Sequence, residues 1–155
     1  MPTNEIGKYP PPSVSYKSFN RLMNMLERNL STRIDISYLS DKFSVRNSTN
    51  LMSAMRFLNI IDNSNRPTPV LKLLAVSTGE HHAALLRQVA YEAYAFVFIK
   101  GKLDPQTATY AELEAVFQNT YQMDDDICHK CIKFFIEFCK DAGIPLSPEF
   151  SKKRI

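Results

Sequence analysis

The chain has 155 residues, the length of one domain or of two small ones. Hydrophobic residues make up 45% of it, and Gly occurs only 4 times with no low-complexity tract, so the composition argues against a fibrous or disordered protein. The formal net charge of +3 is too small to indicate a polyanionic partner by itself.

Charge is unevenly distributed along the chain. Residues 1–76 contain 10 Lys plus Arg and 5 Asp plus Glu, a net charge of +5, whereas residues 77–155 contain 9 and 11, a net charge of −2. A basic excess in the first half is expected if that half contacts phosphates. The alternative is chance, because a few charges decide the sign.

Targeting and redox signals favour a cytoplasmic protein. The first residues are polar and Pro-rich, unlike a signal peptide, and the longest apolar stretch, 93–99, is far shorter than the roughly 20 residues that span a membrane. The three cysteines cannot all pair with one another, which suits a reducing interior better than a disulfide framework. We therefore expect a cytoplasmic location and no membrane contact.

The first expected helix follows a Pro-rich segment. Residues 10–12 are three prolines, which favour an extended polyproline conformation, and the serines after them can start a helix. Over residues 16–29, Phe19, Leu22 and Leu26 recur at helical spacing and predict one inward face. This is the supporting helix that helix-turn-helix modules place before the motif itself.

Two short helices joined by a tight turn are expected next. Asp35 can cap the first, in which Ile36, Leu39 and Phe43 share one buried face. After a break at residues 44–47, a second helix is predicted. Its cap is Asn47 or Ser48, and its inward stripe is formed by Leu51, Met55 and Leu58.

A short strand-turn-strand is expected after the second helix. Ile60 and Ile61 favour a strand, residues 62–66 are turn formers, and Pro67 and Pro69 forbid a continuous central strand beyond them. Helix, tight turn, helix and a small β-wing are together the pattern of a winged helix-turn-helix.

The outer face of the second helix has the residue types that meet base edges and phosphates in a DNA groove. The candidate contacts are Lys42 on phosphates, Arg46, Asn50, Ser53 and Arg56 toward the groove, and Arg66 on the wing. The alternative is that these are ordinary solvated residues, since winged-helix modules also serve as protein-docking domains.

The second half is expected to be helical throughout. A brief helix begins at Pro69, and a long one runs over residues 80–100 with apolar residues on more than one face, as in a buried strut or half of a dimer interface. Residues 109–112 form a capping box for another helix. Three aspartates at 124–126 start a final Phe-rich helix that ends near Gly143.

Motifs for metal binding and catalysis are weak. Cys128 and Cys131 have the spacing of half a zinc site, but the other half is missing, and buried free cysteine is the commoner explanation. The three successive aspartates point in different directions on a helix and form no ligand set. His81 and His82 stand in no triad-like pattern, and the chain has no glycine-rich phosphate loop. We expect no enzyme activity, no metal and no cofactor.

Several short stretches resemble a bacterial domain-of-unknown-function family over about residues 9–142. They are Tyr9-Pro10, Phe57 to Asp62 followed by Arg66-Pro67-Thr68, Ala93-Tyr94 within a long helix, and the Phe-rich final helix. Members of that family usually carry Gly where this chain has Asn59, and in the turn where it has Asn65 or Arg66. Its final helix is often preceded by a Gly-containing turn, where this chain has residues 123–125. The resemblance implies an N-terminal winged helix joined to a helical C-terminal part, and no established activity.

The predicted fold is mostly α, with a winged helix-turn-helix over residues 14–76 packed on a C-terminal helical unit over residues 77–146. The predicted function is non-enzymatic binding of double-stranded DNA by a bacterial or mobile-element protein, as a transcriptional regulator or a DNA-targeting subunit. The alternative is an interaction adaptor whose C-terminal helices bind a protein partner or form a homodimer, with the winged helix as a scaffold. Large apolar residues between 93 and 138 motivate this alternative, because a small chain need not bury them all alone.

Overall fold

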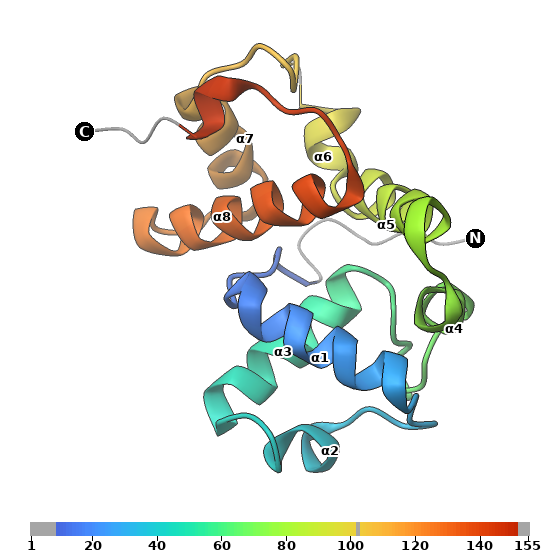
Figure 1. Cartoon of the computed structure of the whole chain (residues 1–155). Helices are drawn as coiled ribbons and strands as arrows, with labels where there is room; N and C mark the ends of the chain where they lie inside the picture. Colours follow the sequence, from blue (N-terminus) through green and yellow to red (C-terminus); the bar gives the residue numbers. More distant parts are fainter. Residues whose placement is uncertain (1–8, 102, 152–155) are drawn as a thin grey trace.

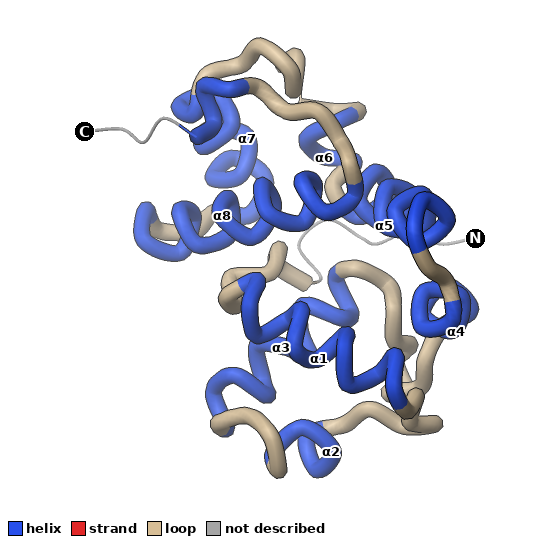
Figure 2. Tube along the Cα trace, in the orientation of Figure 1, coloured by secondary structure: helices blue, strands red, loops and turns tan. Residues whose placement is uncertain are grey.

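The computed structural model describes residues 9–101 and 103–151 and shows a mostly helical protein (Figures 1 and 2). Within those ranges the elements are α1 (Tyr16–Arg28), α2 (Ile36–Ser40), α3 (Val45–Phe57), α4 (Pro69–Val76), α5 (Gly79–Ala93), α6 (Ala95–Phe98), α7 (Tyr110–Tyr121), α8 (Asp125–Ala142) and the 3-10 helix η1 (Pro148–Ser151). The mostly α class is confirmed, but no strand occurs in these ranges and the small β-wing is not shown. No helix of the described chain is both long and apolar enough to cross a lipid bilayer.

Local capping signals place most of the helix starts where the sequence predicts them. The side chains of Ser15, Asp35 and Asp124 each accept a hydrogen bond from the backbone N–H three residues further on. Thr109 and Glu112 form the predicted capping box. A cap of this kind stabilises a helix by about 1 kcal/mol.

The helix α3 starts earlier than predicted. The hydroxyl of Ser44, and not Asn47 or Ser48, caps it by accepting from the N–H of Asn47 at 3.1 Å. Ser48 is buried within the helix, where its hydroxyl donates to the Phe43 carbonyl at 3.4 Å. All three side chains are good N-caps, so local preference alone could not choose between them. In α2, Ile36 was expected to face inward but is 43% exposed.

The segment after α3 is a tight turn with one isolated antiparallel bridge, between Ile61 and Pro67. The Asp62 N–H donates to the Arg66 carbonyl at 2.9 Å, on the turn side of the bridge. The Thr68 N–H donates to the Ile60 carbonyl at 3.0 Å on the other side of the bridge. The two limbs are too short to form the expected strands, because α3 ends at Phe57 and α4 begins at Pro69.

Two asparagines in this region have left-handed backbone conformations. Asn59 has φ 61° and Asn65 has φ 65°. Asn tolerates this region better than most side chains do. The carbonyl of Asn65 also accepts from the N–H of Ile34 at 2.7 Å, which places residue 34 beside the returning limb of the turn.

The long helix expected over residues 80–100 is divided at Tyr94. α5 ends at Ala93, Tyr94 leaves the helical region with φ −101° and ψ 31°, and α6 begins at Ala95. The division lets α5 pack on α8 while α6 packs on α7. This explains how a segment that is apolar on more than one face is buried.

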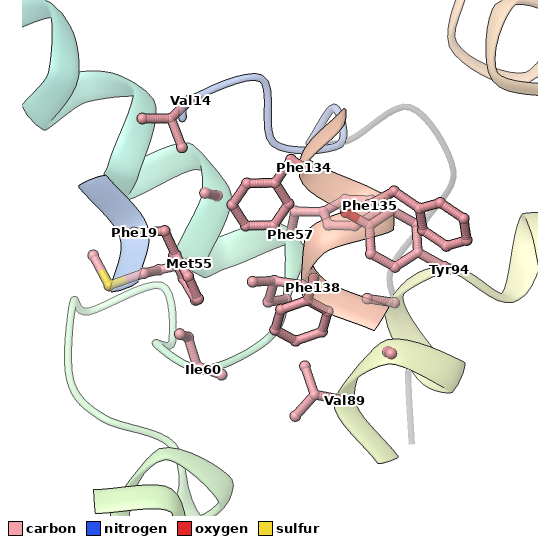
Figure 3. Close-up of a cluster of buried hydrophobic side chains, with 14 of the residues drawn as sticks. Val14, Phe19, Met55, Phe57, Ile60, Val89, Tyr94, Phe134, Phe135 and Phe138 are labelled. Atoms are coloured by element: carbon pink, nitrogen blue, oxygen red, sulfur yellow. The ribbon is translucent and has the colours of Figure 1, made fainter. Parts of the chain in front are cut away.

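The helices α1–α4 and α5–α8 form two layers that share one hydrophobic core (Figures 1 and 3). Edge-on ring pairs cross between the layers, with centroids 5.2 Å apart for Phe19 and Phe134 and also 5.2 Å apart for Phe57 and Tyr94. The predicted boundary between residues 76 and 77 lies at the end of α4, and the division of the chain into these two units stays a prediction.

Most of the large apolar residues between 93 and 138 lie inside this core. Tyr94, Phe96, Phe117, Phe134, Phe135 and Phe138 are each 4% exposed or less. Ile99 and Ile127 remain exposed. The chain therefore buries most of the residues that motivated the adaptor alternative.

Candidate nucleic-acid interface

The first turn of α3 projects from the protein. Val45 is 76% exposed, and Arg46 and Thr49 are also exposed. On the opposite face of the same helix, Leu51 and Met55 are fully buried and anchor it to the core. α3 thus presents its N-terminal end to solvent. Val45 was not predicted from the sequence to contact a partner, because an apolar residue at a helix start is usually assigned to the core.

The six predicted contact residues fall into two groups. Lys42 in the turn before α3, Arg46 on its first turn and Arg66 in the turn after it are exposed. Asn50, Ser53 and Arg56 are half-buried further along α3. The first group is available to a large partner without rearrangement, and the second is not.

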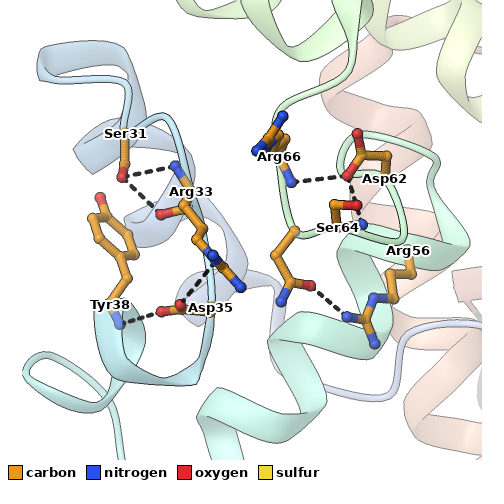
Figure 4. A network of polar contacts seen from close by, with 9 residues as sticks. Ser31, Arg33, Asp35, Tyr38, Arg56, Asp62, Ser64 and Arg66 are labelled. Carbon is orange, nitrogen blue, oxygen red and sulfur yellow. Dashed lines mark hydrogen bonds and ion pairs between the residues drawn. The ribbon is translucent and has the colours of Figure 1, made fainter.

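Arg56 is held against the protein. Its Nη2 donates to Oδ1 of Asn65, while its Nε is buried and has no hydrogen-bond partner among the described residues (Figure 4). The ion pairs within the described ranges also leave Arg56 without a carboxylate, whereas Arg33 pairs with Asp35 at 3.5 Å. Arg56 is therefore a half-buried cation whose one bonded neighbour is a neutral amide.

The turn that carries Arg66 is fixed by Asp62. Its Oδ1 accepts from the N–H of Ser64 at 2.8 Å and from the N–H of Arg66 at 3.0 Å (Figure 4). The hydrogen bond from the Arg66 N–H lowers the pKa of Asp62, and the one from the Ser64 N–H adds a smaller effect in the same direction. A carboxylate that ties two N–H groups of one turn fixes the backbone position from which the exposed Arg66 side chain extends.

An open pocket of about 650 Å³ lies beside α3. It is bounded by α3, by the segment that leads into α2, by the turn after α3 and by the Pro-rich segment. Its lining residues are Tyr9, Arg33, Asp35, Ile36, Ser37, Thr49, Met52, Ser53, Arg56 and Asn65. No sequence pattern predicts this pocket, because residues from four separate segments line it.

Positive charge exceeds negative charge around α2 and α3. The charged residues from 31 to 66 are Arg33, Lys42, Arg46, Arg56 and Arg66 against Asp35, Asp41 and Asp62. The net charge of residues 31–66 is therefore +2, which attracts an anionic partner only modestly.

Ser77 lies beside His82, which the sequence reading did not anticipate. The Ser77 Oγ is 3.0 Å from His82 Nδ1, and His82 Nε2 is 3.9 Å from Glu27 Oε2. The Ser77 hydroxyl also lies 3.2 Å from the Leu74 carbonyl, so its one proton has two acceptors within reach, and the direction of the Ser77–His82 hydrogen bond depends on the imidazole tautomer. The arrangement closes the end of α4.

The cysteines are buried thiols. Cys128, Cys131 and Cys139 are all buried, and burial raises the pKa of Cys131 to about 12, with Cys128 adding a smaller effect in the same direction. Within the described ranges, no group of three or more His, Cys, Asp or Glu side chains could hold a metal ion.

No known protein family, curated protein or solved structure matches the chain. The resemblance to the bacterial family stays a prediction.

Proposed function

We propose that the chain is a non-enzymatic DNA-binding protein, a transcriptional regulator or DNA-targeting subunit, that contacts double-stranded DNA through a winged helix-turn-helix. The motif consists of α2, α3 and the turn at residues 60–68. The observation that carries the proposal is the exposed first turn of α3 between two exposed cations, Lys42 before it and Arg66 after it.

The backbone around α3 supports a minimal wing. α2 packs on α3, as the first helix of a helix-turn-helix does on the second. Ile61 bridges Pro67, and the Ile34 N–H donates to the carbonyl of Asn65 within the turn that joins them. These contacts hold the segment before α2 against the turn that would serve as the wing.

The side chains on the first turn of α3 have the chemistry of direct base readout. Arg46 can donate two hydrogen bonds to guanine, Thr49 can bond to several base edges, and Val45 can contact a thymine methyl group. Recognition helices place their N-terminal residues against base edges, which is the end of α3 that is exposed. Arg33, Lys42 and Arg66 would contact phosphates.

Matched lysine variants test the proposal. Lys42→Gln removes one exposed charge beside α3, and Lys133→Gln removes one exposed charge from α8, in the other layer. Fluorescence anisotropy with random duplex DNA at low salt should show weaker binding for Lys42→Gln and unchanged binding for Lys133→Gln. The slope of log K against log salt should become less steep by about 0.9 for Lys42→Gln alone. Equal effects of the two variants would mean that α3 does not direct binding.

A protein-interaction adaptor is the second candidate. It is favoured by Leu73 and Val76, which are 50% and 79% exposed on one side of α4. A monodisperse monomer that does not bind a dye for exposed apolar surface would count against this candidate.

A further inference from the structure

The pocket beside α3 contains a cation whose charge the described protein does not balance. Arg56 lines the pocket, is half-buried, and has no carboxylate partner and an unbonded Nε among the described residues. A buried charge-bearing donor without an acceptor costs about 1–3 kcal/mol or more. Such a cost is recovered when an anion enters the site.

Asp35, the acidic residue among those that line the pocket, does not neutralise the charge of Arg56. Asp35 Oδ1 accepts from the Tyr38 N–H at 3.0 Å to cap α2, and Oδ2 pairs with Arg33 Nε at 3.5 Å. Both oxygens of Asp35 are therefore used within its own segment. Two guanidinium groups against one carboxylate leave the lining with a net positive charge.

The rest of the lining can hold a ligand larger than a bare ion. Hydroxyl groups of Ser37, Thr49 and Ser53 border the pocket, and Ile36 and Met52 supply an apolar wall. A volume of about 650 Å³ lies within the range of small-molecule sites, roughly 300–1,000 Å³. Tyr9 adds an aromatic ring, against which a flat group can pack.

We propose that this pocket binds a free phosphate ester of nucleotide size, with Arg56 as the principal phosphate ligand. Guanidinium groups pair with phosphate through parallel hydrogen bonds, and a tetrahedral phosphate offers enough oxygens for Arg56, Arg33 and the hydroxyls of Ser37 and Ser53 together. The Thr49 hydroxyl donates to the Val45 carbonyl at 3.1 Å and only borders the pocket. The site does not depend on DNA binding. Because Thr49 and Ser53 belong to α3, the ligand would also contact the helix that is proposed to meet DNA.

Calorimetric titration of the full chain tests this site. The probes are adenosine monophosphate, adenosine and inorganic phosphate. Adenosine monophosphate should bind, adenosine should not, and phosphate should bind more weakly because it lacks the group that packs against the apolar wall. Arg56→Gln should weaken binding of adenosine monophosphate by about tenfold or more, since hydrogen bonds to charged groups are the strong ones. Arg66→Gln, which removes the same charge outside the pocket, should leave it unchanged.

A second variant covers the case in which Arg56→Gln does not fold. Ser53→Leu fills the pocket and keeps Arg56, and it should also abolish binding while circular dichroism shows a native helix content. No binding of adenosine monophosphate to the wild-type chain overturns the proposal. So does equal loss in Arg56→Gln and Arg66→Gln. If the wild-type chain binds no free phosphate ester but Arg56→Gln weakens duplex DNA binding, the pocket serves a backbone phosphodiester and the free-ligand site is refuted.

Discussion

Replacing Tyr94 by Phe should stabilise the protein. The Tyr94 ring is fully buried where α5 gives way to α6, with centroids 4.7 Å from Phe135 and 5.2 Å from Phe57. Its hydroxyl has no hydrogen-bond partner among the described residues. Phe keeps the ring contacts and removes only the hydroxyl.

The magnitude follows from the cost of an unsatisfied buried group. Leaving such a group unpaired costs about 1–3 kcal/mol, and Phe avoids it while losing almost no packing volume. We expect a gain of about 1 kcal/mol in the free energy of unfolding, since some relaxation of the core is normal. For a chain of this length, that gain corresponds to a rise of roughly 2–4 °C in Tm.

Urea denaturation of the wild type, Tyr94→Phe and Tyr91→Phe measures this effect. Tyr91 is 42% exposed on α5, so its hydroxyl reaches water and its removal should change stability by less than about 0.5 kcal/mol. A loss of about 1 kcal/mol or more in Tyr94→Phe would refute the reasoning. It would mean that the hydroxyl bonds to a group such as a buried water and that the phenol stabilises the core.

Three further predictions concern the turn after α3, the start of α7 and the buried ionisable groups. At Asn59, where φ is 61°, substitution by Ala should destabilise by about 1 kcal/mol more than substitution by Gly, as measured by urea midpoints. Thr109→Ala should cost about 1 kcal/mol because it breaks the capping box of α7, and thermal melts followed by circular dichroism would show it; no change would mean that the box contributes nothing. Burial raises the pKa of Cys131 from about 9 and that of Tyr121 from about 10, each to about 12. A folded-state pKa above the unfolded value gives stability that is present below the unfolded pKa and lost as pH rises through the folded one. The urea midpoint should therefore fall between pH 9 and 12 in a pH series, and a flat profile would contradict the burial of these groups.

The features that the sequence predicted correctly are local ones. Asp35, Thr109 and Asp124 cap helices through hydrogen bonds to N–H groups three residues away, so the neighbouring residues suffice to recognise them. The inward stripes of α1 and α8 follow from helical spacing in the same way.

The features that could not be predicted from the sequence depend on residues far apart in the chain. The break at Tyr94 arises because α5 and α6 pack on different helices, which periodicity within the segment cannot express. Helical spacing assigned Arg56 to an outer face, but its guanidinium group donates to Asn65, which lies in the turn after α3. The isoleucine pair indicated β-structure, but the expected strands reduce to one bridge because α3 ends and α4 begins too close to it for longer strands.

The salt dependence of duplex DNA binding tests the central claim most directly. If Arg33, Lys42, Arg46 and Arg66 each neutralise one phosphate, log K for a random duplex should fall with log salt with a slope of about −3.6. The account predicts measurable binding at low salt and a slope near that value. Absence of binding at low salt, or a slope near zero, would contradict it.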